Sequence, residues 1–463
     1  MKPPGERDAS DTLARLTNSQ QVVSLKDFIR TYAIIGLLSF GGPAAQIAVM
    51  HRYLVERKKW LSESRFLDGL SFCSLLPGPE AMQLATYTAW TQRGLWGGLY
   101  AGAVFVAPGF ISIMALSVLY VSAGDAVAVK AMLYGLKPSV LAIVLEAVMR
   151  VGRKSLRSRA AWWIAAGAFV AIAIARVPFP IVIAAAGLLG WMLLRGTGDA
   201  RESREAIGPP RIGRTVATAL VWLVLWWAPV GVISFVTGVG SVLTTLALFF
   251  SLVSVVTFGG AYSVLTYVQQ QAVEVYGWLT HGQMLDALGL AETTPGPLIQ
   301  VVQFVGFLAG YGDVDGGAGD AGGLDAAGAS GGGIVGGVIA SLIVVWVTFV
   351  PCFMWVFTFG PWVEYVCSRR ALRGALGGIM SAVVGVILSL CVSLGIHTLF
   401  TGVGTDLSPI MPRFEEGWAS VRWPAVVIAA VCALLVVRWH AGPITIVAVG
   451  AVMGLVAHFA GLL

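Results

Sequence analysis

The sequence predicts an all-α polytopic membrane protein made of two inverted-topology repeats, with broken, re-entrant helix hairpins that meet near the membrane midplane. The first observation behind this prediction is composition: the 463 residues are 57% hydrophobic and only 12% charged. Apolar stretches long enough to span a bilayer recur along the chain, which excludes a soluble globular domain. The second observation is an internal repeat, and the third is the distribution of basic residues.

The remaining compositional features mainly exclude function classes. The N-terminal segment, residues 1–26, is polar and lacks the apolar core of a cleavable signal peptide, so we expect it to lie in the cytoplasm. The five cysteines form no C-x-x-C motif or Cys/His cluster, and no metal site or cofactor is expected. The net charge of +6 is interpreted as an orientation signal, and no nucleic-acid partner is expected.

The chain repeats itself around two Pro-Gly-Pro motifs, at residues 77–79 and 295–297, which set an offset of 295 − 77 = 218. The same offset pairs three further features without gaps: Phe40-Gly41-Gly42 with Phe258-Gly259-Gly260, Trp60-Leu61 with Trp278-Leu279, and Asp68 with Asp286. Further along, Pro108 matches Pro351 at an offset of 351 − 108 = 243. The second half is therefore longer by 243 − 218 = 25 residues, and most of them lie in 311–333, a glycine-rich acidic loop that we expect to be disordered and periplasmic.

The repeat divides the chain into four parts. A cytoplasmic N-terminal segment is followed by a membrane repeat, a cytoplasmic loop with a linking transmembrane helix, and a second, inverted membrane repeat. Their expected bounds are 1–26, 27–195, 196–239 and 240–463.

Charge decides the expected topology, because loops rich in Lys and Arg stay in the cytoplasm. Four such clusters occur, at 51–65, 150–159, 195–214 and 369–373. The counterpart of the first cluster in the second half, 269–285, has no Lys or Arg, residues 311–333 carry four Asp, and residues 398–421 carry one Arg against three acids. These three segments are expected outside, so the two halves are inverted with respect to each other.

The clusters fit this topology only if the broken segments return to the side from which they enter. We therefore expect re-entrant hairpins at 27–50 and 66–92, and at 241–268 and 286–310 in the second half. Full spans are expected at 94–121, 126–149, 160–177, 178–195, 215–238, 334–360, 374–397, 423–438 and 442–462. The alternative, in which the broken segments are full spans, places basic clusters such as 150–159 outside.

The breaks themselves point to an anion. Non-helical backbone at membrane depth is tolerated only inside the protein or beside a wet cavity. Each break begins a half-helix, near Pro43, Pro79, Gly260 and Pro297, whose first N–H groups and about half a positive charge attract anions. Inverted repeats with broken helices at a central site are typical of secondary transporters. The alternative is that the motifs are kinks that allow close helix packing.

Several side chains near the breaks are candidates for substrate contact. Six amides and hydroxyls can donate hydrogen bonds to a tetrahedral oxyanion, or alternatively can join helices: Gln46, Gln83, Thr293, Thr294, Gln300 and Gln303. Lys137 is a base within a span and is therefore a functional candidate, with snorkelling or a structural ion pair as the alternative. His51 and Arg52 form a cytoplasmic entry or are simply part of the basic cluster.

Two acids stand beside the Pro-Gly-Pro motifs. Glu80 directly follows the first motif and Glu292 precedes the second. An acid beside an anion site is useful if it titrates in step with the substrate, so both are candidates for proton coupling. The alternative for Glu80 is the acid that helix N-termini favour.

The motifs "SFGGPAAQIAVMHRYL" and "LLPGPEAMQL" in the first half, and "TFGGAYSVLTYVQQQ" and "AETTPGPLIQ" in the second, resemble the chromate ion transporter (CHR) family over nearly the whole chain. The resemblance implies a two-domain carrier in the bacterial inner membrane that exports chromate with the proton gradient and gives resistance. The family residues it carries over are Gly41, Gly42, Pro43, Gln46, Arg52, Pro77, Gly78, Pro79 and Gln83, then Gly259, Gly260, Pro295, Gly296 and Pro297. Ala261 replaces the proline found at Pro43, so that half-helix is expected to start less sharply.

The leading hypothesis is a proton-coupled chromate exporter that is not an enzyme. Chromate and sulfate are alike in shape and charge, so a sulfate carrier or exchanger, with sulfate as competitor, stays open, as does a passive anion channel. A membrane enzyme acting on a phosphorylated lipid lacks a visible nucleophile or metal cluster, and the Walker A pattern of an ATP-driven pump is absent. A homodimer in the membrane lipid is compatible with the sequence, which leaves the oligomeric state open.

Overall fold

A computed structural model describes residues 23–124, 126–194, 212–258, 261–312, 332–363, 370–401 and 420–462. These residues are helical almost throughout, and β structure among them is limited to an isolated bridge between Phe400 and Val421. The chain is thus an all-α polytopic membrane protein. Five of the described helices are long and apolar enough to cross a bilayer: α5, α6, α9, α14 and α16.

The first half contains α2 (Leu25–Leu37), α3 (Gly42–His51), η1 (Arg52–Arg57), α4 (Glu63–Cys73), α5 (Glu80–Ala123), α6 (Val127–Ser155), α7 (Arg159–Ala173) and α8 (Phe179–Leu193). The linking helix is α9 (Ile212–Thr237). The second half contains α10 (Val242–Val256), α11 (Ala261–Gln269), η2 (Gln270–Val275), α12 (His281–Thr293), η3 (Leu298–Gln300), α13 (Val301–Tyr311), α14 (Gly333–Phe359), η5 (Gly360–Trp362), α16 (Arg370–Leu399), α17 (Trp423–Trp439) and α18 (Pro443–Phe459).

The elements repeat with the offset found in the sequence. The two π-helical turns, η1 and η2, begin at Arg52 and Gln270, which are 270 − 52 = 218 residues apart. Helices α4 and α12 begin at Glu63 and His281, again 281 − 63 = 218 apart. Helix α5 is interrupted at Arg93 and Gly94, where the backbone leaves helical φ/ψ, so the boundary expected between residues 92 and 94 is present.

Three helices are shorter than expected. The segments predicted as full spans at 160–177 and 178–195 become α7 and α8, with 15 residues each, and the one predicted at 442–462 becomes α18, with 17 residues. Helix α17, with 17 residues, agrees with the span expected at 423–438. At 1.5 Å per residue, 15 residues extend about 22 Å, which is less than a hydrocarbon core of about 30 Å. Helix α7 ends early because Arg176 takes a left-handed backbone, with φ 51°, just before Pro178.

The breaks follow from glycine and proline chemistry. Gly41 and Gly42 have φ of 83° and 78°, a region that residues with a Cβ avoid, and Pro43 follows in the first turn of α3. Gly78 and Gly296, in the middle of the Pro-Gly-Pro motifs, have φ of 123° and 98°. Each motif therefore turns the chain sharply before a new helix starts, at α5 and at η3.

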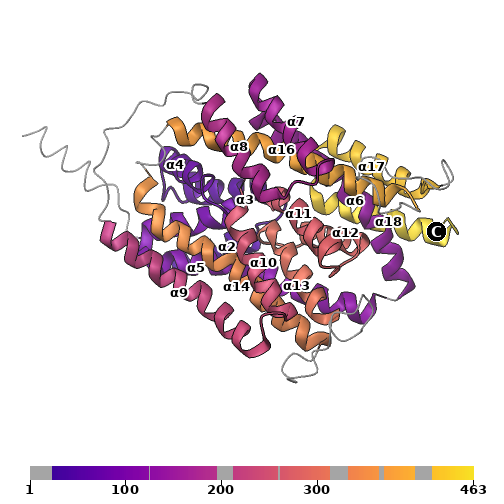
Figure 1. The fold of residues 1–463 in the computed structure, drawn as a ribbon, viewed down its shortest axis with the longest axis horizontal. Coiled ribbons are helices and arrows are strands. Elements are labelled where there is room, and N and C mark those ends of the chain that lie inside the picture. The colour runs from indigo at the N-terminus through magenta and orange to yellow at the C-terminus, as the bar shows by residue number, and fades with distance from the viewer. Residues whose placement is uncertain are drawn as a thin grey trace, which may run out of the picture.

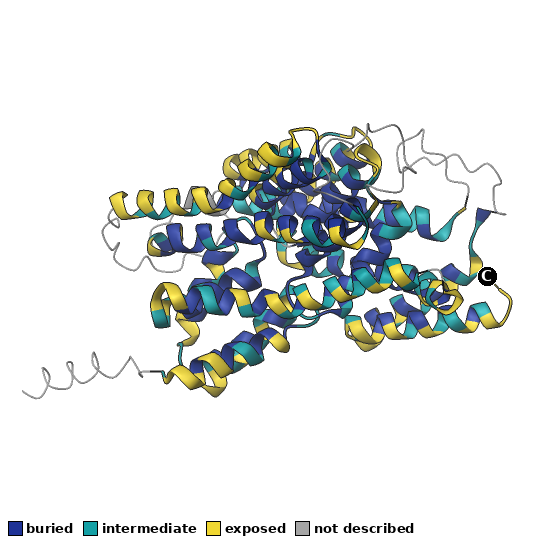
Figure 2. Cartoon of the chain, turned by 90° about the horizontal axis from the view of Figure 1, so that it is seen from below, coloured by how far each residue is buried: buried dark blue, intermediate teal, exposed yellow. Residues whose placement is uncertain are grey.

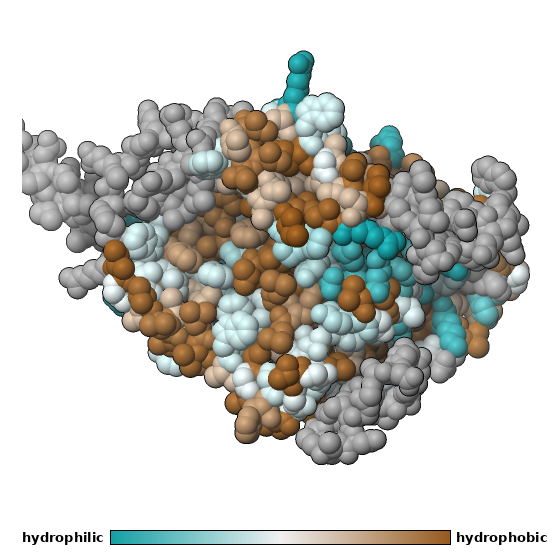
Figure 3. Space-filling model, in the orientation of Figure 1, coloured by the Kyte–Doolittle hydropathy of each residue, from teal (hydrophilic) through white to brown (hydrophobic). Residues whose placement is uncertain are grey.

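The helices form two groups around a common core (Figure 1). Helices α6, α16, α17 and α18 lie together, and α9, α10, α13 and α14 form the other group. Buried residues concentrate where the helices meet, and exposed ones lie on the outward faces (Figure 2). Much of the outer surface is apolar (Figure 3), and α9 is the extreme case, because only 11% of its apolar window is buried. Such faces suit contact with lipid.

Helices of the two halves pack closely against each other where both carry glycines. Gly135 in α6 packs against Gly450 and Gly454 in α18 so closely that a Cβ on Gly135 would lie 2.0 Å from the Gly450 carbonyl oxygen. In the other half, a Cβ on Gly378 in α16 would lie 2.6 Å from the Cα of Gly190 in α8. Gly135 and Gly378 are equivalent under the second offset (378 − 135 = 243), so the crossing recurs with the halves exchanged. Small residues allow this close approach of membrane helices.

Candidate functional site

The Pro-Gly-Pro loop of each half is hydrogen-bonded to the segment that precedes the Phe-Gly-Gly motif of the other half. The Gly78 N–H donates to the Thr257 carbonyl oxygen at 2.7 Å, and the Gly296 N–H donates to the Ser39 carbonyl oxygen at 2.9 Å. Both pairs obey the same offset, since 296 − 78 = 218 and 257 − 39 = 218. Exchanging the halves converts one hydrogen bond into the other, as a two-fold relation requires. The four breaks therefore meet in two reciprocal pairs.

Each loop also packs against the long helix of the opposite half. A Cβ on Gly296 would lie 3.3 Å from the Cα of Gly109 in α5, and one on Gly78 would lie 2.9 Å from the Cys352 sulfur in α14. Gly109 and Cys352 are equivalent (352 − 109 = 243) and each follows the proline inside its helix. Both motifs are thus closely packed here, Gly296 against the backbone of Gly109 and Gly78 against the Cys352 side chain.

The predicted glutamines bind carbonyl oxygens at these breaks. The Gln46 amide donates to the Gly296 oxygen at 2.6 Å and to the Ser39 oxygen at 3.4 Å, and so joins the two halves. Gln83 donates to the Pro77 oxygen at 2.7 Å, within its own motif. Gln300 and Gln303 donate to Val106 and Phe110 of α5, each at 3.0 Å. Gln46, Gln300 and Gln303 thus join different segments of the chain in this structure, and Gln83 closes its own motif.

Replacing Gln46 with Leu is expected to destabilise the protein. The change removes the donor that the Gly296 carbonyl meets inside the protein, and an unpaired buried acceptor costs about 1–3 kcal/mol. The measurement is thermal unfolding of the purified protein in detergent. Ala48→Leu, on an exposed face of the same helix, is the control. Equal melting temperatures for Gln46→Leu and the parent would contradict the prediction.

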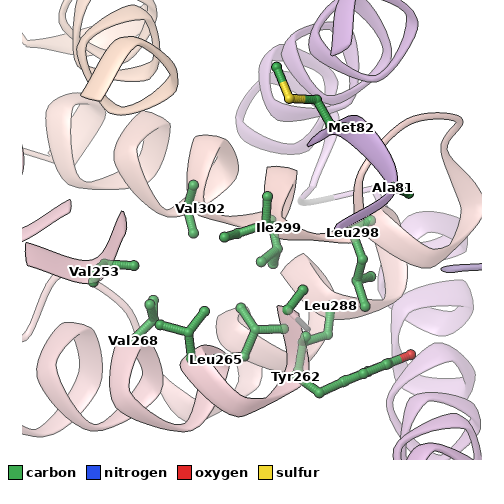
Figure 4. Close-up of a cluster of buried hydrophobic side chains, with 14 of the residues drawn as sticks. Ala81, Met82, Val253, Tyr262, Leu265, Val268, Leu288, Leu298, Ile299 and Val302 are labelled. Atoms are coloured by element: carbon green, nitrogen blue, oxygen red, sulfur yellow. The ribbon is translucent and has the colours of Figure 1, made fainter. Parts of the chain in front are cut away.

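The threonine hydroxyls are engaged with their own helix. Thr293 donates to the Leu290 oxygen at 2.8 Å and Thr294 to the Ala291 oxygen at 3.1 Å. The second break is lined by buried apolar side chains, including Leu298 and Ile299, which are 4% and 1% exposed (Figure 4). The breaks are closed in this conformation.

Glu292 is a buried acid beside the second break. Its side chain accepts a hydrogen bond from the Tyr262 hydroxyl, and the residue is 3% exposed. Figure 4 shows Tyr262 at the edge of the apolar cluster with its hydroxyl directed away from it. The charges of Arg150 and Glu146, an ion pair of 3.7 Å on α6, act on this carboxyl. Glu292 and Tyr262 thus form a buried polar pair from α12 and α11, and the half-buried ion pair of α6 contributes charge to it.

Glu80 has a different environment. It is the first residue of α5, directly after Pro79, and is half-buried. The Ser74 hydroxyl interacts with its carboxyl, and Lys154 near the C-terminal end of α6 contributes the opposite charge. Ser74 is the counterpart of Glu292 (292 − 74 = 218). The two acids therefore lie at related but chemically unequal places.

Lys137 is paired with an acid from the other half. Its Nζ lies 3.5 Å from the Oδ2 atom of Asp286 in α12, and the same oxygen accepts a hydrogen bond from Tyr120 at 3.1 Å. Asp286 is 2% exposed. A cavity of about 390 Å³ opens at this pair, and its lining includes Lys130 and Tyr134. Lys137 thus contacts α12 about two turns before the break.

The remaining predicted residues are placed as follows. Arg52 is exposed at the start of η1, at the end of α3 away from Gly42 and Pro43. His51 lies 3.2 Å from Glu56 and 2.7 Å from Glu63, which ties it to its own loop. Gly259 and Gly260 fall outside the described residues. Among the described residues no three His, Cys, Asp or Glu side chains gather as a metal site would require.

Sequence reasoning did not assign roles to Tyr120, Tyr262 and Asp286. Asp286 was noticed only as a partner in the repeat, although an acid in an apolar segment is by itself a functional signal. The tyrosines carry no such signal, because an intramembrane tyrosine is usually packing or an interface anchor. Only the fold brings Tyr262 to Glu292 and Tyr120 to Asp286.

Comparison with known proteins identifies relatives over most of the chain. The family profile described as "Chromate transporter" matches residues 26–191 and 244–455. The chromate transport protein of Pseudomonas aeruginosa is 34% identical over 355 residues, 76% of this chain and 76% of that protein. The chromate transport protein of Cupriavidus metallidurans is 25% identical over 380 residues, 81% of this chain and 84% of that protein.

A shorter relative matches part of the chain. An uncharacterized transporter of Bacillus subtilis is 27% identical over 127 residues, which are 27% of this chain and 71% of that protein. No solved structure matches the chain. The profile covers both halves and omits the region around α9. The paired breaks, the repeat and the relatives agree, and this chain belongs to the chromate transporter family.

Proposed function

We propose that this protein is a proton-coupled secondary transporter that exports chromate from the cytoplasm and so confers chromate resistance. Family membership supports chromate as the transported substrate. The single observation that carries the mechanism is the reciprocal pairing of the four breaks, Gly78 with Thr257 and Gly296 with Ser39. A carrier that alternates between two access states needs a central site shared by two related halves.

The proposed membrane arrangement is the inverted one, with the repeats at 27–195 and 240–463 and the N-terminus in the cytoplasm. The reciprocal contacts support a two-fold relation between the halves. The basic residues near the C-terminal end of α6, Arg150, Arg153 and Lys154, support a cytoplasmic position for that end. The proposed location is the bacterial inner membrane.

The proposed substrate site is formed by the ends of the half-helices. When the breaks separate, the N–H groups of Gly78 and Gly296 and the amide of Gln46 lose their present carbonyl partners in the other half and become donors for a tetrahedral oxyanion. Such donors bind a dianion without a fixed opposing charge. The residues proposed to take part are Gly41, Gly42, Pro43, Gln46, Arg52, Pro77, Gly78, Pro79, Gln83, Lys137, Gly259, Gly260, Thr293, Thr294, Pro295, Gly296, Pro297 and Gln300.

Proton coupling is proposed to use Glu292, with Glu80 as the second candidate. An ionised carboxylate is costly to bury without a cation, whereas a protonated one that is hydrogen-bonded is not. Glu292 is more deeply buried than Glu80 and has the Tyr262 hydroxyl as donor. Proton exchange at this carboxyl therefore changes the charge next to the second break.

The test is uptake of radiolabelled chromate into inside-out membrane vesicles, with and without an imposed proton gradient. Accumulation that requires the gradient and is competed by sulfate is the expected result. Flux that follows only the chromate gradient identifies a channel, and flux that requires sulfate on the opposite side identifies an exchanger. Vesicles without the protein, and cells without it grown on chromate, are the controls.

A further inference from the structure

The cavity beside Lys137 brings water to a buried acid, Asp286. The cavity has a volume of about 390 Å³ and lies where α5 ends and α6 begins, and Asp286 of α12 is part of its lining. A water molecule takes about 30 Å³, so several fit, and the lysine, tyrosine and carboxylate groups of the lining are polar partners for them. In the proposed orientation the cavity faces the periplasm, because the opposite end of α6 carries the basic residues Arg153 and Lys154.

The ion pair of Lys137 and Asp286 leaves the carboxylate incompletely satisfied. The Lys137 Nζ lies 3.5 Å from the Oδ2 atom, farther than the about 2.7–2.9 Å of a charge-assisted hydrogen bond, and the Tyr120 hydroxyl donates to the same oxygen at 3.1 Å. The Oδ1 atom is buried and has no hydrogen-bond partner. A buried ion pair stabilises a protein only when its remaining lone pairs are also satisfied, so this pair is poorly suited to a purely structural role.

The groups around Asp286 fit a proton better than a larger ion. Helices α5 and α6 place four titratable side chains at the cavity: Tyr120, Lys130, Tyr134 and Lys137. Helix α16 places His397 against His281 at the start of α12, with ring centroids 3.7 Å apart. Helices α13 and α18, which also pack against α12, contain no Asp, Glu, Lys or Arg. A metal ion would meet an ammonium group beside a single carboxylate, whereas a proton needs only one lone pair and removes the buried charge.

The ion pair lies within a close contact between α6 and α12. Gly282, Asp286 and Gly289 follow one another at spacings of four and three residues, and so lie on one face of α12. A Cβ on Gly282 would lie 3.1 Å from the Lys137 Nζ, and one on Gly289 would lie 2.0 Å from the Leu136 Cδ2 atom. Small residues allow this close approach, and the ion pair is the polar link within it. Loss of the ion pair therefore weakens the attachment of α12 to α6.

We propose that Asp286 is the entry point for the coupling proton, which it takes from cavity water on the periplasmic side. A hydronium ion gives its proton to the carboxylate and becomes water, while Lys137 keeps its charge and turns into the cavity. This step breaks the ion pair and releases α12 next to the second break, since Thr294, the C-cap of α12, is 294 − 286 = 8 residues or about 12 Å further along. The inference rests on the proposed function and adds a proton-binding residue before Glu292, which follows Asp286 by 292 − 286 = 6 residues.

The first half offers a matched control residue. Asp68 is equivalent to Asp286 (286 − 68 = 218), and Met380 is equivalent to Lys137 (380 − 137 = 243). Methionine cannot supply the ammonium group that Lys137 supplies, and Asp68 is half-buried, with the Ser64 hydroxyl donating to it at 3.5 Å. In the inverted arrangement Asp68 lies toward the cytoplasm. Asp68→Asn is therefore expected to leave the response to periplasmic pH as it is in the parent.

The test varies the pH inside inside-out vesicles, where the lumen corresponds to the periplasm, and holds the outer pH constant. Chromate accumulation by the parent is expected to rise as the lumen is acidified. Asp286→Asn keeps an oxygen for Lys137 and Tyr120 but cannot bind the proton, so accumulation is expected to fall at least about tenfold and to lose its dependence on lumenal pH. Exchange of internal for external chromate is expected to continue. Asp286→Glu restores a carboxyl group and is expected to restore the dependence on lumenal pH.

Tyr120→Phe gives a readout that a merely structural ion pair would not move. The change keeps the ring that packs against Phe304 and removes a hydrogen bond to the ionised carboxylate. Because that bond favours the ionised form, its loss is expected to move the lumenal pH of half-maximal accumulation upward. An unchanged half-maximal pH would contradict the assignment to Asp286.

Infrared difference spectroscopy of the purified protein, without chromate, tests proton binding separately from transport. Acidification is expected to produce the carbonyl band of a protonated carboxyl group in the parent, and this band is expected to weaken in Asp286→Asn. Identical bands in the two proteins would overturn the inference, even where the variant transports poorly because it folds poorly. Dependence on lumenal pH that survives in Asp286→Asn but is lost in His281→Gln would overturn it too, in favour of the histidine pair. A parent whose accumulation ignores the proton gradient defeats the proposed function instead, whatever the spectra show.

Discussion

Gly109→Ala is expected to abolish chromate flux and to lower the yield of folded protein. The added methyl group would lie 1.9 Å from the Oε1 atom of Gln300 and 2.4 Å from the Pro295 carbonyl oxygen. The first neighbour is a side chain that can rotate, but the second is backbone of the Pro-Gly-Pro motif. Accommodating the methyl group requires the second break to move away from α5. Overpacking of a close contact costs about 1–3 kcal/mol or more.

The measurements are size-exclusion behaviour and thermal unfolding in detergent, together with vesicle flux. Gly167→Ala in α7 is the matched control, since a Cβ there meets no atom within 4 Å. In that helix alanine is favoured over glycine by up to about 1 kcal/mol, so the control is expected to be neutral or stabilising. Cys352→Ala, at the position equivalent to Gly109, tests the opposite change and is expected to retain flux. Parent-like flux and stability of Gly109→Ala would mean that the contact with the break is not tight.

Glu292→Gln is expected to remove the dependence of chromate flux on the proton gradient. The amide preserves size and a hydrogen-bonding group next to Tyr262 but cannot release a proton. Exchange of internal for external chromate needs no net proton movement, so it is expected to continue. Gradient-driven accumulation is expected to fall at least about tenfold, equivalent to 1.4 kcal/mol or more of lost driving force. The measurement compares exchange with gradient-driven uptake in the same vesicles.

Two variants decide whether the effect belongs to this carboxyl. Glu80→Gln removes the other candidate acid and is expected to leave the gradient dependence in place. Tyr262→Phe keeps the acid but removes its donor, and is expected to change the pH at which flux is half-maximal. Gradient-driven accumulation that survives in Glu292→Gln and is lost in Glu80→Gln would transfer the coupling role to Glu80. Survival in both would refute proton coupling through either acid.

Much of the fold could be predicted from the sequence because its signals are local. A Pro-Gly-Pro motif cannot continue a helix, so the breaks before Glu80 and Leu298 were predictable, as was the start of a helix at Gly42. Repetition at a constant offset predicted that residues 51–65 and 269–285 are equivalent, and each segment contains a π-helical turn, η1 or η2. The lengths of α7 and α8 were less predictable, because apolar residues continue past the helix ends.

The candidate site was predicted only in part. Gln46 was correctly placed at a break, but its bond to the Gly296 carbonyl spans 250 residues and no sequence pattern indicates it. Lys137 was recognised as an unusual base, while its partner Asp286 lies 286 − 137 = 149 residues away on a helix of the other half. Such pairs depend on how α6 and α12 cross, which glycine contacts and side-chain packing decide.

The sequence by itself therefore determined the class of protein, the positions of its helices and breaks, and the existence of two related halves. These properties depend on residue-by-residue hydrophobicity, on backbone restrictions at glycine and proline, and on repetition, all of which are readable along the chain. Only the tertiary structure decided which break meets which, and that the glutamines hold carbonyl oxygens in this closed state. It alone paired Glu292 with Tyr262 and Lys137 with Asp286. The physical reason is that hydrogen bonds and ion pairs act over a few ångströms in space, a distance that sequence separation does not encode.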